Sequence, residues 1–527
     1  MPPPPVDRRE LLRLAAATAS TLWLPRSAWS RPRLQQDPFA LGVASGAPGP
    51  QGVVLWTRLL FPDPNPAALT LRWEVAHDEG FTRMARSGQV QALPELAHAV
   101  HAEVEGLESD RWYFYRFLLG DAVSPVGRTR TLPAPGAAAA RLRLGYASCQ
   151  RWEHGYYAAW RDLREQAPDL VLFLGDYIYE YPGATDMVRA VSGGWVLTLD
   201  DYRARHALHR SDADLRAMHA ACPWLLTWDD HEVQNDYAGL HEGTGVTLLG
   251  GTVDDFAARR AAAYQAWYEH MPVRASVLTQ ALGGLARGAE LRIHQHVDWG
   301  RLARLYLLDG RQYRDRQPCQ DVQRPGGRLV DPAACPEWAD ARRSYLGAAQ
   351  ERWLDAALAQ SGGRWNVLGQ QTLFGPRDAQ PGPGQRLWND GWDGYAGART
   401  RLTGALQRHA VRNPVLLGGD VHEHWVGHVQ ADYADARSLT VGVEFCGTSI
   451  SSRSRASSIA RAPERLAENP HFVFGEARWR GYGLADFTPG RLTTTLRAVE
   501  DATRADSPVF TLAQFEVADG RPRIERV

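Results

Sequence analysis

The sequence contains no lysine, so all 59 basic residues are arginine. It has only five cysteines among 527 residues, which excludes a small domain stabilised mainly by disulfides. The formal net charge is −1, so the chain lacks the excess positive charge of dedicated nucleic-acid-binding or membrane-surface proteins. Beyond the N-terminus, no hydrophobic run reaches the roughly 18 residues that a transmembrane helix needs. We therefore expect neither a specific nucleic-acid partner nor a transmembrane anchor.

Apolar residues, in contrast, are plentiful: 44% of the chain is hydrophobic and 19 residues are tryptophan. This composition supports large cores and excludes a mainly disordered chain. At about 150 residues per domain, the length predicts two to four domains.

The N-terminus is typical of a signal peptide. Arg8 and Arg9 form an arginine pair, residues 14–24 form a weakly hydrophobic run, and small residues follow around Ala28. The paired arginines favour the twin-arginine route, which exports folded proteins. We therefore expect residues 1–30 to be a twin-arginine signal peptide, the export machinery to be a partner, and the protein to be periplasmic or secreted. A basic amphipathic helix is the alternative interpretation.

Residues 38–133 carry the signals of an all-β domain. Short β-branched or aromatic runs at 53–56, 69–75 and 112–117 are separated by turns rich in glycine and proline. Strands at this spacing predict a small β-sandwich. Residues 131–140, rich in alanine and proline, then form a linker.

From residue 141 to residue 527 the pattern changes to that of an α/β core. Apolar segments alternate with segments of helical periodicity at 156–166, 254–270 and 345–360. The apolar segments have the continuous hydrophobicity of buried central strands. They are residues 142–147, 170–174, 224–228, 305–308, 365–368 and 414–417. Strands that alternate with helices indicate an α/β fold.

Each of these predicted strands is followed by polar residues that can bind metals. They include Cys149, Asp176, Asp230, Asp309, Gln371 and Asp420. In α/β folds, binding sites gather at the carboxyl ends of the strands. One aspartate after a strand is usually a helix cap or a turn residue, but the repetition of the pattern predicts a polynuclear metal site.

Several motifs occur in a fixed order along the chain. They are Cys149, GDYIYE at 175–180, WDDHE at 228–232 and GGDVH at 418–422. This order resembles the PhoD-type alkaline phosphatases and phosphodiesterases, a family of the calcineurin-like metallophosphoesterase superfamily. Further similar segments extend the resemblance over nearly all of the mature chain. They are LGVASG at 41–46, LWTR at 55–58 and RGY at 480–482.

The resemblance implies a fold and an activity. The fold is a calcineurin-like β-sandwich flanked by helices, of class α/β, over residues 141–527, preceded by a small all-β, fibronectin-III-like domain over residues 38–133. The activity is metal-dependent hydrolysis of phosphate esters, either small or polymeric, by an exported alkaline phosphatase. The implied cofactors are a ferric ion, Fe(3+), and calcium, Ca(2+).

The resemblance also implies metal ligands by position. Those of the ferric ion would be Cys149, Asp176, Tyr179 and His422. Asp176 would also bridge to calcium, and Asp420 would bind on the calcium side. At the third strand end either Asp230 or Asn235 would be a ligand, because both offer an oxygen donor. This donor set suits the metals, since Fe(III) accepts carboxylate, tyrosinate and thiolate, whereas Ca(II) takes oxygen ligands.

Three further residues are expected around the substrate. His231 occupies the position of the superfamily histidine that contacts phosphate or assists the leaving group, so we predict that it is catalytic together with Asp176. Arg311 is a third catalytic candidate that would meet the anionic substrate, or alternatively would brace Asp309. His424 would face the phosphate or support the metal ligands.

Cys319 and Cys335 flank a loop rich in proline and glycine. In an exported protein such a pair predicts a disulfide, which would stabilise the fold by about 3 kcal/mol on the chain-entropy model.

Two alternative functions remain open at this stage. A phospholipase D-like phosphodiesterase would carry the same motifs, and turnover of p-nitrophenyl phosphate compared with its bis ester would separate the two activities. The remoter alternative is an exported binding protein with a metal-stabilised fold and no turnover. It is less favoured because a structural metal does not require His231 and rarely recruits so many strand ends.

Overall fold

The computed structural model describes residues 37–63, 65–183, 186–244, 253–278, 290–321, 323–435 and 437–527. The predicted signal peptide lies outside the described residues. Within the described part of the chain, none of the helices combines the length and the apolar character that crossing a membrane requires.

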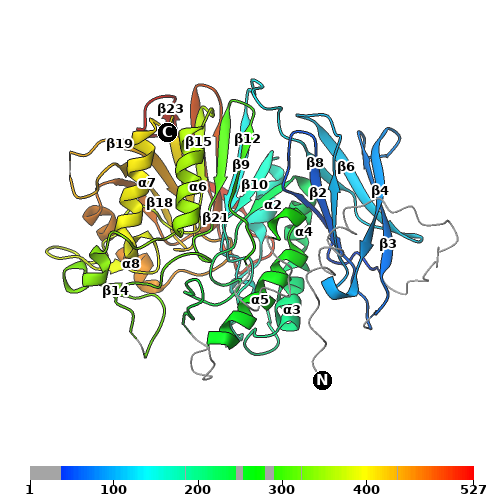
Figure 1. The fold of residues 1–527 in the computed structure, drawn as a ribbon, viewed down its shortest axis with the longest axis horizontal. Coiled ribbons are helices and arrows are strands. Elements are labelled where there is room, and N and C mark those ends of the chain that lie inside the picture. The colour runs from blue at the N-terminus through cyan, green and yellow to red at the C-terminus, as the bar shows by residue number, and fades with distance from the viewer. Residues whose placement is uncertain are drawn as a thin grey trace.

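Two large β-sheets form the centre of the molecule (Figure 1). The ten-stranded sheet has the order β24 (Ile524–Arg526), β23 (Val509–Ala518), β22 (Arg491–Val499), β21 (Arg480–Phe487), β9 (Leu142–Ala147), β10 (Leu170–Phe173), β11 (Trp224–Leu226), β1 (Val43–Gly46), β2 (Val53–Arg58) and β5 (Ala99–Val104). The seven-stranded sheet has the order β12 (Gln295–Trp299), β13 (Ala303–Leu307), β15 (Trp365–Gly369), β17 (Pro414–Gly418), β19 (Thr440–Cys446), β18 (His424–Gln430) and β20 (Phe472–Glu476). The six apolar segments of the sequence are strands β9, β10, β11, β13, β15 and β17, with boundaries within two residues of those predicted.

The alternation of side chains along each strand explains why these segments are apolar throughout. In β10, Leu170 and Leu172 belong to the core between the two sheets, where residues such as Val367 of the facing sheet also lie. Val171 and Phe173 point the other way, into the core beneath the helices. A strand that is buried on both faces needs apolar residues at every position.

Helices cover the outer faces of both sheets. The ten-stranded sheet packs against α2 (Ala158–Glu165), α3 (Leu199–Arg210), α4 (Ala213–Ala221) and α5 (Val253–His270). The seven-stranded sheet packs against α6 (Ala348–Ala359) and α7 (Ala396–Arg408). The last helix, α8 (Ala456–Glu468), precedes β20, and β14 (Leu329–Val330) pairs with β16 (Leu387–Trp388). The fold class predicted from the sequence, a β-sandwich flanked by helices, is confirmed.

The N-terminal region forms a second β-sandwich (right of Figure 1). Its outer sheet contains β3 (Leu69–Ala76), β4 (Met84–Ala92), β6 (Trp112–Leu119), β7 (Ala122–Val123) and β8 (Gly127–Arg130). This sheet shares a core with β1, β2 and β5.

The two sandwiches share one sheet, a feature that the sequence does not predict. Gly46 of β1 pairs in parallel with Trp224 of β11, so β1, β2 and β5 continue the central sheet. A side chain at Gly46 would lie 2.4 Å from the Pro272 carbonyl oxygen, which explains why glycine occupies this junction. The N-terminal domain thereby covers an edge that β11 would otherwise expose.

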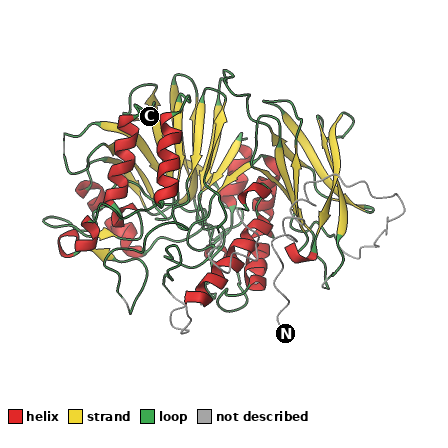
Figure 2. Cartoon of the chain, viewed as in Figure 1, coloured by secondary structure: helices red, strands yellow, loops and turns green. Residues whose placement is uncertain are grey.

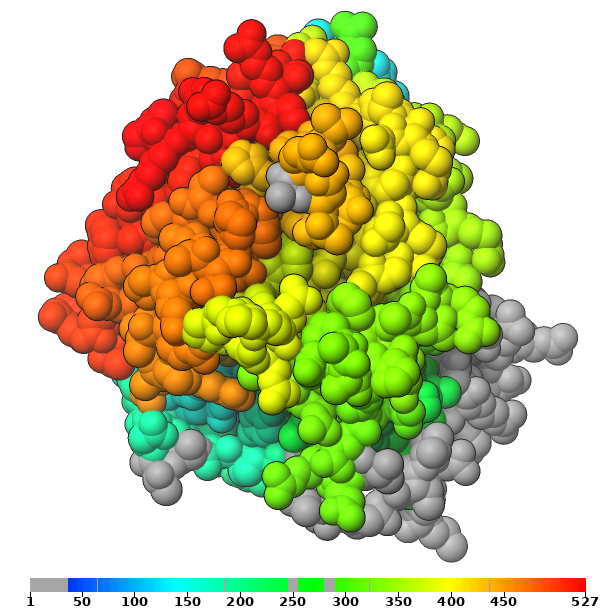
Figure 3. All heavy atoms as spheres, turned by 90° about the vertical axis from the view of Figure 1, so that its left-hand side faces the viewer, coloured from blue at the N-terminus to red at the C-terminus, as the bar shows by residue number. Residues whose placement is uncertain are grey.

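Long loops gather at one end of the central strands, between the two groups of helices (Figure 2). The face of the molecule remote from the N-terminal domain is formed mostly by the second half of the chain, from green through yellow to red (Figure 3).

Candidate metal centre

The predicted strand ends meet in space. Strands β9, β10 and β11 are parallel to one another, as are β13, β15, β17 and β19 in the other sheet. Acidic, histidine and cysteine side chains that follow these strands have ligand atoms within 4.8 Å of one another in overlapping groups. They are Cys149, Asp176, Asp229, Asp230, His231, Asp420 and His422.

The turns after these strands have an unusual backbone. Cys149, Asp176, Asp420 and His422 all adopt the left-handed conformation, with φ between 57° and 65°. Residues other than glycine rarely adopt it, and such strain concentrates at functional sites. Gly175, with φ of 113°, precedes Asp176, and a side chain there would lie 2.4 Å from the Asp229 Cβ. The two strand ends can therefore approach only because residue 175 is glycine.

The four residues predicted to bind iron lie together. Ligand atoms of Cys149, Asp176 and His422 lie within 4.8 Å of one another. The Tyr179 hydroxyl is 2.9 Å from Asp176 Oδ2 and 3.3 Å from His422 Nε2. The site therefore brings thiol, phenol, imidazole and carboxylate donors to one point.

Asp176 is common to three groups of possible ligands. Besides the group with Cys149, its carboxylate belongs to one with Asp230 and His231 and to another with Asp229 and Asp420. Asp176 is only 1% exposed, and its Oδ1 has no hydrogen-bond partner in the part of the chain that the structure describes. A buried carboxylate oxygen without a partner is costly unless a cation lies beside it.

The third strand end offers more carboxylates than the sequence analysis selected. Asp230 takes part in two groups, the second with Asp236 and Asp390. The main-chain N–H of Asn235 donates to Glu180, 2.8 Å away, and its side chain remains an alternative to Asp230 as a ligand. Asp229, Asp236 and Asp390 were not selected from the sequence. Asp229 stands beside Asp230 in the same motif, whereas Asp390 follows the short strand β16 and carries no comparable signal.

Arg311 lies among these carboxylates and is fully buried. Its guanidinium donates to Asp229 and, over 2.8 Å, to Asp390, and lies 3.5 Å from Asp230. Its main-chain N–H, rather than its side chain, donates to Asp309. The sequence analysis left a substrate contact and a bracing role open for Arg311, and this environment favours bracing, with Asp229 and Asp390 as partners of the guanidinium.

His231 is oriented by a buried carboxylate. Its Nδ1 lies 2.7 Å from Glu180 Oε2, which leaves Nε2 for another partner. Burial lowers the pKa of His231, but Glu180, followed by Asp176 and Asp230, raises it well above its ordinary value. The arrangement therefore favours a protonated imidazole.

His424 belongs to none of the groups of possible ligands found among the described residues. It is fully buried, its Nδ1 accepts from the Thr448 main-chain N–H over 3.2 Å, and its Nε2 has no partner among the described residues.

The electrostatics of the centre are those of a cation site. Burial, followed by the negative charge of Asp176 and Asp420, raises the pKa of the Cys149 thiol well above its ordinary value. Burial and then Asp230 raise the pKa of Asp420 to about 6. Burial also raises the pKa of Asp176, and the opposing effect of His231 does not offset it. A bound cation would favour the ionised form of all three groups. With the unpartnered oxygen of Asp176, this donor set fits the metals that the resemblance implies.

Cys319 and Cys335 form a disulfide, and Cys149, Cys222 and Cys446 are free and buried. The free thiol at the centre is therefore that of Cys149, while the disulfide closes a loop elsewhere.

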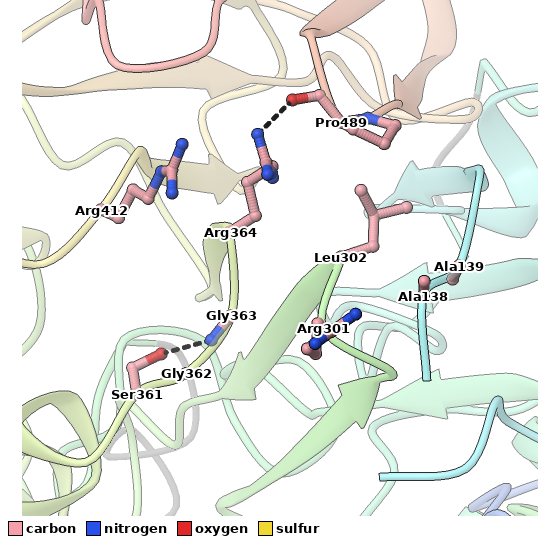
Figure 4. Close-up of a pocket in the computed structure, with 10 residues that line it drawn as sticks. All are labelled: Ala138, Ala139, Arg301, Leu302, Ser361, Gly362, Gly363, Arg364, Arg412 and Pro489. Atoms are coloured by element: carbon pink, nitrogen blue, oxygen red, sulfur yellow. Dashed lines mark hydrogen bonds between the residues drawn. The ribbon is translucent and has the colours of Figure 1, made fainter. Parts of the chain in front are cut away.

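A separate cavity of about 440 Å³ lies at the opposite end of the sheets. Arg301, Arg364 and Arg412, which line it, precede β13, β15 and β17, whereas the site residues follow parallel strands. Figure 4 shows Arg364 directed to the Pro489 carbonyl oxygen, 2.9 Å away. Arg364 and Arg412 both pair with Asp519, so their charge is partly neutralised. This cavity takes no part in the metal centre.

Comparison with known proteins gives consistent matches. The family model "PhoD-like phosphatase" matches residues 144–496, and "PhoD-like phosphatase, N-terminal domain" matches residues 25–133. Alkaline phosphatase D of Bacillus subtilis (strain 168) is 41% identical over 496 residues, which are 92% of this chain and 81% of that protein. A solved structure described as "Structure of PhoD" superposes with a TM-score of 0.86 at 40% identity, covering 94% of this chain and 93% of the other.

Proposed function

Since the chain belongs to the PhoD-like phosphatase family and is thus a hydrolase of phosphate esters, we propose that it is an exported alkaline phosphatase that uses a ferric ion and calcium. The observation that carries the metal assignment is the convergence of three groups of donors on the buried carboxylate of Asp176. The family assignment confirms the resemblance drawn from the motifs.

The ligands divide by chemistry. Cys149, Tyr179 and His422, with Asp176, would hold the ferric ion, because trivalent iron accepts thiolate, tyrosinate and imidazole donors. Oxygen donors from Asp176, Asp420 and either Asp230 or Asn235 would hold calcium. When bound, these ions supply Lewis-acid activation of water and neutralise charge on the phosphoryl group.

His231 would act on the substrate directly. Glu180 holds Nδ1, so Nε2 is the nitrogen that can donate to a phosphoryl oxygen or to the leaving oxygen. The buried carboxylate of Glu180 raises the pKa of His231 and so favours the protonated form that this donation needs. Arg311 would act through Asp229 and Asp390 and hold these carboxylates in place.

The substrate is proposed as a phosphate monoester, a phosphate diester, or both, in small or polymeric form. The phospholipase D-like alternative shares the same site, and relative turnover of p-nitrophenyl phosphate and its bis ester distinguishes the two. We further propose that the twin-arginine signal at residues 1–30 directs the folded protein to the periplasm or out of the cell.

Substitution of the shared carboxylate tests the assignment. Asp176→Asn should reduce turnover to background while the protein still folds, because the amide cannot supply the negative charge that three donor groups share. The matched control is Asp340→Asn. The side chain of Asp340 accepts hydrogen bonds from the guanidinium of the exposed Arg342, away from the candidate site. Retained activity in Asp176→Asn, measured with p-nitrophenyl phosphate beside circular dichroism, would sink the assignment.

Metal analysis of the exported wild-type protein tests the cofactors. Stoichiometric iron and calcium with a visible tyrosinate-to-iron absorption band are expected. Zinc or manganese without colour would leave the phosphatase family intact but overturn the ligand roles of Cys149 and Tyr179.

A further inference from the structure

The loop 447–455, between β19 and α8, enters the metal centre from the C-terminal part of the chain. Three of its serines, Ser449, Ser451 and Ser452, are fully buried. Buried hydroxyl groups need hydrogen-bond partners, so the contacts of each serine show what it holds in place.

Ser452 contacts two of the proposed iron ligands at once. Its Oγ lies 2.7 Å from the Tyr179 hydroxyl oxygen and 2.9 Å from the main-chain carbonyl oxygen of Cys149. It also accepts from the Arg151 main-chain N–H over 3.1 Å. One hydroxyl therefore ties the phenol of Tyr179 to the turn that presents the Cys149 thiol.

Arg480, the first residue of β21, holds this loop. Its guanidinium donates to the Ser452 carbonyl oxygen (2.6 Å), the Ser449 hydroxyl (2.8 Å) and the Ser454 hydroxyl (2.8 Å). It also donates to the His422 carbonyl oxygen over 3.0 Å. Because one rigid, nearly buried group fixes both the loop and the backbone of a ligand, Ser452 has little freedom to move away from Tyr179.

The number of protons shared between Tyr179 and Ser452 shows which of the two hydroxyl groups can donate to the other. The phenol donates to Asp176 Oδ2 over 2.9 Å, while the single Ser452 proton has two acceptors within reach. If Tyr179 binds a metal as tyrosinate, its proton leaves to solvent and its oxygen can only accept hydrogen bonds. The Ser452 proton then has a charged acceptor, and a hydrogen bond to a charged acceptor is roughly twice as strong as a neutral one.

We propose that Ser452, anchored by Arg480, is a positioning residue that donates its hydroxyl proton to the Tyr179 oxygen when that oxygen ligates metal. This inference rests on the proposed ferric centre. Ser452 does not touch the reacting atoms; it sets the orientation and the donor strength of the tyrosinate, as outer partners of metal ligands do.

The test compares Ser452→Ala with Ser451→Ala in the full-length exported protein. Ser451 is equally buried in the same loop, but its hydroxyl donates to the Arg151 carbonyl oxygen, 2.8 Å away, and not to Tyr179. Iron retention during chelator titration and the position of the visible absorption band are measured for both variants and the wild type. Thermal unfolding shows whether the two substitutions destabilise the protein to the same extent.

In Ser452→Ala we expect iron to be released at about 10- to 100-fold lower chelator concentration, the usual effect of losing an outer partner of a metal ligand. The absorption band should move to longer wavelength, because an unprotected phenolate is a better electron donor. Ser451→Ala should leave both unchanged, and Ser452→Thr, which restores a hydroxyl, should return the band toward the wild-type position.

Two failures are distinguishable. A wild-type protein without iron and without a visible band overturns the ferric centre and, with it, this role of Ser452. A wild-type protein with the band, and a Ser452→Ala variant whose band and iron retention match those of Ser451→Ala, overturns the role of Ser452 alone.

Discussion

Arg311 and Arg480 are both buried at the metal centre, but they differ in what they contact. Arg311 faces carboxylates: it donates to Asp229 and Asp390 and lies 3.5 Å from Asp230. The hydrogen-bond acceptors of Arg480 are all uncharged, namely carbonyl and serine oxygens. The two arginines thus support the two halves of the site by different means.

Arg311 balances the charge of the carboxylates, whereas Arg480 fixes the geometry of the backbone. On the carboxylate side, the protein itself supplies a positive charge, so those aspartates stay paired whether or not a cation is bound. On the side of Cys149, Tyr179 and His422, the arginine orients the backbone, and the charge of these proposed ligands would be left to a bound metal. Loss of Arg311 should therefore destabilise the fold, whereas changes around Arg480 should mainly lower the affinity for metal.

The largest expected effect is that of Arg311→Met. Removing one partner of a buried ion pair leaves uncompensated charge, which costs about 3–5 kcal/mol of unfolding free energy. Urea unfolding followed by circular dichroism measures it. The control is Arg342→Met, because Arg342 pairs with Asp340 on the surface with a side chain 91% exposed. Exposed pairs contribute only about 0–1 kcal/mol.

The opposite result would favour the other role that the sequence analysis left open for Arg311, contact with the substrate. If Arg311→Met unfolds at the wild-type urea concentration but loses kcat, then the guanidinium acts on the substrate and the distinction between the two arginines fails.

A smaller effect is expected at Glu180, a buried carboxylate that pairs with a histidine instead of an arginine. Glu180→Gln removes the charge that favours protonated His231 but preserves the shape of the side chain. Turnover should fall by about 10- to 100-fold, as for other partners that orient a histidine at a metal site. Steady-state kinetics with p-nitrophenyl phosphate measures the loss in kcat.

Glu351→Gln, in the α6 ion pair with Arg401, is the matched control. An unchanged kcat in Glu180→Gln would mean that His231 needs no orienting charge, and would remove Glu180 from the proposed chemistry.

The sequence predicts a residue of this centre when that residue directly follows a recognisable strand. It does not predict a residue that reaches the centre only through contacts distant in the sequence. The strands β9, β10, β11, β13, β15 and β17 are largely buried, so each is recognisable as an apolar segment, and the candidate ligand that follows it is recognisable by position. Asp176 and Asp420 were found in this way.

Residues outside such strand ends were missed for a physical reason. Asp390 lies in a turn, Ser452 contacts Tyr179 across 273 residues of sequence, and Arg480 acts on that contact through Ser452. The shared sheet was missed likewise, because the pairing of Gly46 with Trp224 leaves no pattern in either segment alone.

The shared sheet contains a buried histidine outside the candidate site, His101, whose effect on stability can be compared with that of the site residues. His101 of β5 is buried, and its Nε2 lies 2.9 Å from the Tyr268 carbonyl oxygen and 3.0 Å from that of Met271, at the end of α5. Burial lowers its pKa from 6.5 to about 4. Because the folded state prefers the neutral form, the stabilisation is complete above pH 6.5 and is lost as the pH falls toward 4.

The smallest expected effect is therefore a change in how steeply the unfolding free energy depends on pH. Protonation of one such histidine on unfolding costs about 1.4 kcal/mol per pH unit between pH 6.5 and 4. His101→Gln should flatten the pH dependence of the unfolding free energy by that amount, both with and without chelator, since no metal ligand is involved. Urea unfolding at pH 7, 6 and 5 measures it. Parallel curves for the variant and the wild type would show that His101 does not cause this pH dependence, and would remove the junction as a reference for the two halves of the site.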